Sequence, residues 1–363
     1  MNGADANAVW GRLRRAGLVE GDAPDKAETH TPWYIRTMLG VAGWIGAMFL
    51  LGFFLGAFSL VANSPIVALI LGGALVTAAA LVFRTWPAGD FAGQFGLAVS
   101  IAGQSLVVMG LGQLIPLSDA LVALVFAVVQ AGLFVLIPNF LHRVLVSASA
   151  TAAGVYALGI WGFLPYTQPL VFAAFAWVWV HEFSYPRHGA QLRALGYGLT
   201  LLVIYGLVVY TATGAWRAMG IGGAIANPVG GAIAFWISNA LTGAVMIWLV
   251  WKLLARQGVA VAEGAGLAAL GGAVLAALIA LKAPGLAITV AILLLGFANG
   301  NRVLFGLGVL SLPAYWSYYY YSLEITLLQK SALLACAGIA LIGARMAVIR
   351  RWPAAAGREE RDA

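Results

Sequence analysis

Few side chains in this sequence could perform acid–base or metal chemistry. Of its thirteen acidic residues, eight lie within the first 28 and the last five residues. The remaining five are Asp90, Asp119, Glu182, Glu263 and Glu324. His181 and Glu182 precede His188 by seven and six residues, which is not the H-E-x-x-H zinc spacing. With so few carboxylates and one cysteine, we expect no metal site and no cofactor.

The sequence also lacks the G-x-x-x-x-G-K-[ST] motif, so an ATPase of the P-loop kind is excluded. The formal net charge of +7 could indicate nucleic-acid binding, but the basic residues are scattered between apolar stretches. We therefore expect no nucleic-acid partner. The sequence contains no recognisable set of catalytic residues that would support an enzymatic activity.

Three amide side chains, Gln104, Gln130 and Asn239, lie inside long apolar stretches. In antiparallel neighbouring helices Gln104 and Gln130 would reach similar depth, where an interhelical hydrogen bond contributes about 0.6–2 kcal/mol. Each amide can make a packing bond between helices or line a path for a polar solute. Ser238 and Thr242, on either side of Asn239, leave the same two alternatives open.

Near the carboxyl end, the charged residues Glu324 and Lys330 are separated by six positions. On a helix this separation places them about 120° apart, so they are not a natural intrahelical ion pair. Lys330 then either extends to a membrane interface or bonds elsewhere in the bundle. We treat both residues as possible functional or structural polar positions.

The densest aromatic cluster also lies near the carboxyl end. Its members are Tyr315, Trp316, Tyr318, Tyr319, Tyr320 and Tyr321. At the end of a membrane span such rings form an interfacial belt, because the ring body is apolar while its polar group favours water. The alternative is a site for a ligand or a lipid headgroup. Pro313, in the same stretch, predicts a kink.

The elements that must position these residues are apolar helices. Apolar residues make up 62% of the chain and charged residues only 9%, with a mean hydropathy of +0.93. A soluble protein has about 25% charged residues. Apolar runs such as residues 38–60 match the roughly 20 residues that a helix needs to cross a bilayer. In lipid the backbone must satisfy its own hydrogen bonds, so these runs predict an all-α polytopic transmembrane helix bundle.

Hydropathy predicts about twelve spans, with eleven as the alternative count. They cover residues 38–60, 66–83, 93–114, 120–137, 144–164, 169–183, 194–213, 232–251, 264–281, 284–298, 303–320 and 329–349. Connections are short, so no sizeable soluble domain is expected. We divide the chain into a tail over 1–36 with a possible amphipathic helix, one transmembrane domain over 37–350, and a tail over 351–363. The glycine-rich stretch 214–231 is a possible re-entrant segment.

The basic residues predict the orientation of these spans. With twelve spans and both termini in the cytoplasm, seventeen of the twenty Lys and Arg residues fall on the cytoplasmic side. Only Arg217, Lys282 and Lys330 do not. Cytoplasmic loops retain cations in this way. The first thirty residues are polar and carry both charge signs, so we expect no secretory signal peptide.

The segment 293–345 contains LLLGFANGNRVLFGLGVL and, further on, YYYSLEITLLQKS. In this segment the chain resembles a bacterial membrane family catalogued as domain of unknown function 4401. The most specific pieces are Tyr319 to Leu323, Thr326 to Ser331, and Gly296-Phe297 with Arg302. The resemblance implies a bacterial inner-membrane location. It carries over no activity and no binding residues.

Three functional hypotheses remain. The first is a non-enzymatic inner-membrane component that acts with a membrane protein partner or a second copy of itself. The alternative is a transporter-like or lipid-handling permease, with membrane lipids as partners in either case. The third is a membrane-embedded enzyme that uses histidines of the inner face or Glu324. A solvated cavity reaching mid-membrane would favour the permease, and a solidly packed bundle would favour the first hypothesis.

Overall fold

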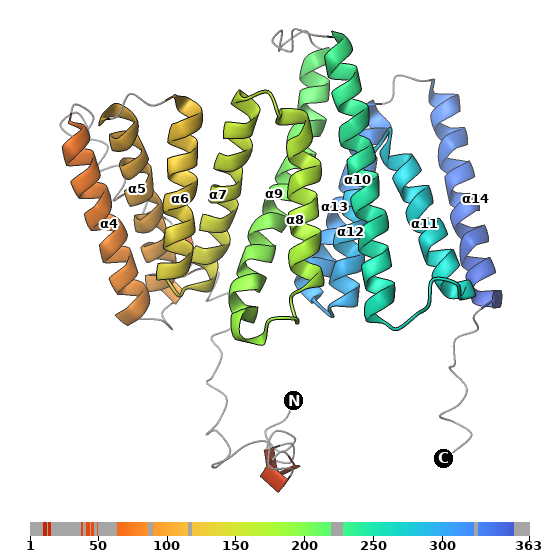
Figure 1. Cartoon of the computed structure of the whole chain (residues 1–363), viewed down its shortest axis with the longest axis horizontal. Helices are drawn as coiled ribbons and strands as arrows, with labels where there is room; N and C mark the ends of the chain where they lie inside the picture. The colour runs from red at the N-terminus through yellow and green to blue at the C-terminus, as the bar shows by residue number, and fades with distance from the viewer. Residues whose placement is uncertain are drawn as a thin grey trace. The chain divides into compact units, whose positions relative to one another are not determined.

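A computed structural model describes residues 64–85, 90–114, 118–218, 228–322 and 326–351, together with a few separate residues between 10 and 49. Within these residues the chain is α-helical and has no strand. The helices are α4 (Pro65–Thr85), α5 (Asp90–Leu114), α6 (Asp119–Leu136), α7 (Phe140–Ile160), α8 (Leu164–Val180), α9 (Gly189–Ala218), α10 (Pro228–Arg256), α11 (Gly264–Ala280), α12 (Pro284–Ala298), α13 (Arg302–Ser322) and α14 (Leu327–Arg351), with one 3₁₀ turn at Pro186–His188 (Figure 1).

Each predicted span from the second to the twelfth corresponds to one of these helices, with both ends within five residues. The first predicted span, 38–60, lies mostly outside the described residues. Six described helices are long and apolar enough to cross a membrane, and α8, α11 and α12 are shorter apolar helices. The α-helical class is therefore confirmed for the described residues, and these helices are compatible with a membrane protein. The count of about twelve crossings stays a prediction.

Prolines and a glycine set several helix ends. Pro284 is the first residue of α12 and Pro165 the second of α8, positions at which a missing backbone N–H costs no intrahelical hydrogen bond. At the end of α12, Gly300 has a φ of +63°, which is a left-handed conformation that favours glycine. The N–H of Asn301 then donates to Gly296 O at 2.9 Å and that of Gly300 to Phe297 O at 3.1 Å. This pair of bonds is a Schellman motif, and it terminates α12 sharply.

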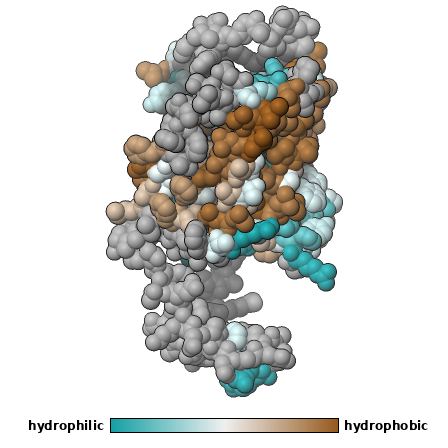
Figure 2. Space-filling model, turned by 90° about the vertical axis from the view of Figure 1, so that its left-hand side faces the viewer, coloured by the Kyte–Doolittle hydropathy of each residue, from teal (hydrophilic) through white to brown (hydrophobic). Residues whose placement is uncertain are grey.

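The helices divide into two compact units. The first covers residues 1–117 with 137–139, and its described helices α4 and α5 pack closely through glycines. A Cβ added at Gly72 would lie 2.7 Å from the carbonyl oxygen of Gly103. Glycines allow this approach of two backbones, as in helix pairs within membranes. Exposed apolar side chains cover α4, and Figure 2 shows them in brown.

The second unit covers residues 118–136 and 140–363. Its centre is α12, which contacts α8, α9, α10, α11 and α13, while α7 packs against α6, α8 and α9. Fully buried side chains of the core include Phe172, Phe175, Trp179, Leu249, Ile288, Ile292, Leu295 and Leu304. The short α12 is thus enclosed on several sides, and the ends of its neighbours meet at its two ends.

Several predictions lie wholly or partly outside the described residues. These are most of the tail over 1–36, the tail from 352, residues 219–227 of the possible re-entrant segment, and Glu324. Residues 214–218 and 228–231 are helical, as the last turn of α9 and the first turn of α10. The single domain over 37–350 stays a prediction.

Candidate functional site

A buried carboxylate lies where α8 ends. Glu182 follows α8 by two residues and is only 4% exposed. Its Oε1 accepts a hydrogen bond from Arg193 Nε of α9 at 2.9 Å, and its Oε2 accepts one from Asn299 Nδ2 at 3.1 Å. A buried carboxylate is costly unless it is paired and hydrogen-bonded, and here both oxygens have donors.

Asn299 connects this carboxylate to two further helices. It follows the last residue of α12, and its Nδ2 also donates to the backbone oxygen of Trp179 at 2.8 Å. Its Oδ1 accepts a hydrogen bond from Arg256 Nη1, the last residue of α10, at 3.1 Å. The same Nη1 lies 3.3 Å from Val180 O, and the Arg256 guanidinium lies 5.9 Å from the centre of the Phe183 ring. One amide therefore joins the ends of α8, α10 and α12.

Asn301 holds the start of α13 beside α9. Its Oδ1 accepts hydrogen bonds from the backbone N–H of Leu304 at 3.1 Å and from the Tyr197 hydroxyl at 2.9 Å. The first bond is a helix N-cap. The Tyr197 ring meets Trp179 edge to face, with centroids 5.2 Å apart, and Trp179 Nε1 donates to Thr200 Oγ1 at 3.2 Å. These bonds connect α8, α9 and the turn between α12 and α13.

We name Glu182, Arg193, Arg256, Asn299 and Asn301, with Tyr197, the polar network. Each oxygen of the carboxylate accepts one hydrogen bond, and the Asn299 amide donates two and accepts one within the protein. Such a network can fix helix ends, since buried groups that satisfy one another specify one arrangement.

In the sequence Glu182 is one of five acidic residues outside the two ends of the chain, and no pattern there pointed to Asn299, Asn301 or Tyr197. A signal was present in the asparagines on both sides of Gly300, within the family-like segment. Two amides in a three-residue turn between apolar helices indicate a helix cap and hydrogen bonds to neighbouring helices.

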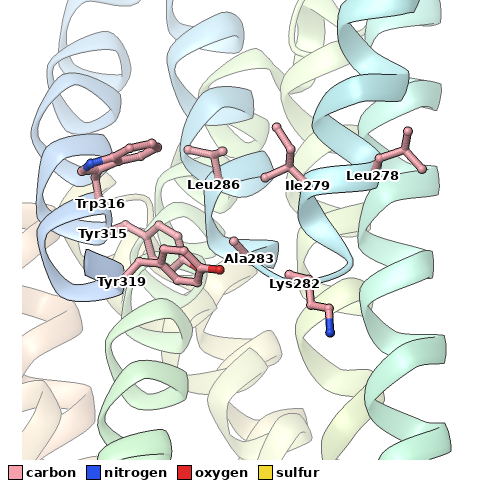
Figure 3. A pocket seen from close by; sticks show the side chains of 8 residues that line it. All are labelled: Leu278, Ile279, Lys282, Ala283, Leu286, Tyr315, Trp316 and Tyr319. Carbon is pink, nitrogen blue, oxygen red and sulfur yellow. The ribbon is translucent and has the colours of Figure 1, made fainter. Parts of the chain in front are cut away.

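A pocket of about 320 Å³ lies at the other end of the second unit. Trp236 of α10 lies at the pocket end, and Arg256 of the same helix lies in the polar network, twenty residues away. On a helix that separation is about 30 Å. The pocket lining comes from three helices and one turn: Leu278 and Ile279 of α11, Lys282 and Ala283 of the turn, Leu286 of α12, and Tyr315, Trp316 and Tyr319 of α13 (Figure 3).

Glycine and aromatic packing shape this pocket. A Cβ added at Gly285 would overlap the Tyr315 ring, so Gly285 lets that ring pack onto the start of α12. Tyr315 and Tyr319 are stacked, with ring centroids 6.2 Å apart. Three of the six predicted aromatic residues thus line the pocket, whereas Tyr320 and Tyr321 pair edge to face with centroids 5.4 Å apart. Tyr318 is half-buried and does not line it.

Lys282 is exposed at one edge of the pocket. Its Nζ lies 4.6 Å from the centre of the Trp236 ring. The turn that carries it is fixed by Asn239, whose Nδ2 donates to Leu281 O at 3.0 Å. Asn239 is thus placed in a bond between α10 and the α11–α12 turn. Next to it, Ser238 Oγ donates to Pro165 O at 2.6 Å.

The other predicted polar positions are not among the residues that line the pocket. Gln104 is buried in α5, and its Nε2 donates to Ser100 of the same helix at 2.9 Å. Gln130 is buried in α6 of the second unit, so the expected Gln104–Gln130 bond stays a prediction. Lys330 lies at the start of α14 with its Nζ 5.0 Å from the centre of the Tyr320 ring.

Within the residues that the structure describes, no three His, Cys, Asp or Glu side chains lie together in a way that could hold a metal ion. His181 Nδ1 lies 2.8 Å from Trp177 O, a contact within α8 and its final turn. His142 is buried in the first turn of α7.

Comparisons with known proteins place the chain in a family. The model of the family described as Domain of unknown function (DUF4401) matches residues 32–351. Neither the curated proteins nor the solved structures contain a match. The matched range contains both the polar network and the pocket.

Proposed function

This chain is a member of the family described as Domain of unknown function (DUF4401), and we propose that it is a non-enzymatic membrane component whose α11–α13 pocket holds the tail of a membrane lipid. The single observation that carries the proposal is this pocket. It is lined mainly by aliphatic and aromatic side chains and lies at the end of a helix bundle. Its volume of about 320 Å³ falls within the range of small-molecule sites, roughly 300–1,000 Å³.

The contrast between the two ends of the second unit supports this assignment. At the polar network, Glu182 and Asn299 are bonded to their neighbours, so the groups hold helices rather than a ligand. At the pocket, apolar side chains surround open space. Figure 3 shows Leu278, Ile279, Leu286 and Trp316 around that space. An apolar chain is the ligand whose chemistry matches such a lining.

The proposal includes a topology. We infer twelve spans in a bacterial inner membrane with both termini in the cytoplasm. The distribution of cations supports it, since seventeen of twenty would face the cytoplasm. In this orientation Arg193, Arg256 and Arg302 face the cytoplasm, and the pocket with Lys282 faces outward. The lipid would then come from the outer leaflet.

We propose two related functions beside this one. A partner protein or a second copy of the chain could contact exposed apolar helix faces, as the non-enzymatic hypothesis requires. A lipid-handling permease would use the same pocket as a loading site. The polar network favours a component that holds its lipid, because it ties the opposite ends of α8, α9, α10 and α12 together.

Native mass spectrometry of the full chain, purified in a mild detergent, tests the proposal. We expect a retained lipid on the unmodified protein and its loss in Ile279→Trp. Ile279 lines the pocket and is 40% exposed, so the larger ring can enter the open space without displacing the core. Leu275→Trp is the matched control, because Leu275 lies on the same helix, is 60% exposed and does not line the pocket.

Equal lipid retention by both tryptophan variants would contradict the proposal. Far-UV circular dichroism and thermal unfolding of each variant would establish that lipid loss does not follow from misfolding.

A further inference from the structure

We propose that the pocket selects an anionic phospholipid, with the lipid phosphate bound at Lys282. This inference rests on the proposed lipid-binding function and names the class of lipid. A lipid tail already lies in an apolar medium, so its transfer into the pocket has little hydrophobic driving force, as for helix association in membranes. Selection therefore has to come from the headgroup.

The pocket lining contains one ionised side chain, and it is a cation. Among the residues that line it, Lys282 carries the charge, while the others are aliphatic or aromatic. Figure 3 shows Leu278, Ile279 and Leu286 on one side and, on the other, Ala283, the hydroxyl of Tyr319 and Lys282, whose ammonium end points away from the aromatic rings of the pocket lining. This separation of an apolar region from a cationic edge matches an amphiphile with a negative headgroup.

The local geometry holds this ammonium group at the edge of the pocket. Its Nζ lies 4.6 Å from the centre of the Trp236 ring, a cation–π contact that restricts the long side chain. Asn239 bonds the preceding carbonyl, Leu281 O, at 3.0 Å and so fixes the turn. The carboxyl end of α11 and the amino end of α12 meet in this turn, so their dipoles offset each other. The ammonium is then the dominant local charge.

No acidic residue of the described part of the chain lies within 4 Å of Lys282 Nζ, in contrast to Arg193, which is paired with Glu182. In the proposed topology Lys282 is also one of three cations that do not face the cytoplasm. A cation on the outer side runs against the usual distribution. A lipid phosphate would supply the counter-charge that the described residues do not place within 4 Å of Lys282 Nζ.

Lipid titrations of the purified full chain, followed by native mass spectrometry, test the inference. The probes are phosphatidylglycerol and phosphatidylcholine with identical acyl chains. A cation near an anionic headgroup contributes about 1 kcal/mol, which is about five-fold in affinity. We expect phosphatidylglycerol to bind about five-fold tighter than phosphatidylcholine to the unmodified chain. In Lys282→Met, which keeps the apolar stem, the two affinities should become equal.

Lys330→Met is the matched control, because Lys330 also lies over an aromatic ring, that of Tyr320, but does not line the pocket. It should keep the five-fold preference. Equal affinities in the unmodified chain, or the same loss of preference in both lysine variants, would overturn the headgroup assignment. Displacement of phosphatidylglycerol by inorganic phosphate would also overturn it, since the site would then bind a free anion.

The tryptophan variants separate this inference from the proposed function. If Ile279→Trp weakens both lipids while the unmodified chain shows no preference, the pocket holds a lipid but Lys282 does not select it. If Ile279→Trp changes neither affinity, the lipid-binding function itself is wrong.

Discussion

In the Arg193–Glu182 ion pair, removing the exposed arginine should destabilise the protein more than neutralising the buried glutamate. The Arg193 side chain is 53% exposed, whereas that of Glu182 is 4% exposed. In Arg193→Met the carboxylate loses the donor to Oε1 and stays buried beside Asn299. In Glu182→Gln the arginine is left without its partner, but it can turn to water. The two variants remove the same contact and leave different groups behind.

The expected costs follow from these environments. A buried charge that loses its partner costs about 3–5 kcal/mol, and we take about 3 kcal/mol for Arg193→Met because Glu182 lies near a helix end. The ion pair itself contributes only about 0–1 kcal/mol, since solvent screens the half-exposed arginine. In Glu182→Gln the Asn299 amide also donates to a neutral instead of a charged oxygen, which costs about 1 kcal/mol more. Glu182→Gln should therefore cost about 1–2 kcal/mol.

The double variant tests directly whether the buried charge causes the destabilisation. With Arg193→Met and Glu182→Gln together, no buried charge remains, so the cost should return to about that of Glu182→Gln alone. Unfolding in mixed micelles of dodecyl maltoside and sodium dodecyl sulfate, followed by far-UV circular dichroism, measures all three free energies. If Arg193→Met costs no more than Glu182→Gln, or if the double variant shows the sum of both, burial of Glu182 does not control this pair.

Three further outcomes are expected. Gly296→Ala should destabilise by about 1–3 kcal/mol, because its Cβ would overlap the backbone of α13. Gly271→Ala, with nothing within 4 Å of its added Cβ, should be neutral or stabilising by up to about 1 kcal/mol; similar losses in both would refute the packing argument. Gly300→Ala should cost about 1–2 kcal/mol in the same unfolding assay, because of its φ of +63°, and Gly300→Asn should cost less. Reporter fusions should place residues next to Arg256 in the cytoplasm and residues next to Lys282 outside, and the reverse result would overturn the proposed topology.

The helices and their ends could be read from the sequence because lipid imposes local rules. A backbone in hydrocarbon must satisfy its hydrogen bonds within its own segment, so an apolar run of sufficient length predicts a helix. The helix α12 matches its predicted range of 284–298 at both ends, where Pro284 is its first residue and Gly300 follows its C-cap. At the start of α9 the predicted span begins at 194, whereas the helix begins five residues earlier at Gly189, because polar Gln191 and charged Arg193 lower the hydropathy of the first turn.

For the aromatic cluster, the sequence predicted part of the candidate site. Its sequence predicted either an interfacial belt or a ligand site. Tyr315, Trp316 and Tyr319 share one side of α13 because a helix repeats every 3.6 residues. That they line a pocket depends on α11 and α12, and on Gly285, which admits the Tyr315 ring.

The sequence by itself determined the apolar helices and their order, because both depend on the composition of short segments. Only the tertiary structure decided which polar groups meet. Asn299 is 117 positions from Glu182, and Tyr197 is 104 positions from Asn301. No local pattern specifies such pairs, since a side chain at a helix end finds its partner through the packing of whole helices. That packing also decided that Glu182, one of thirteen acidic residues, is buried.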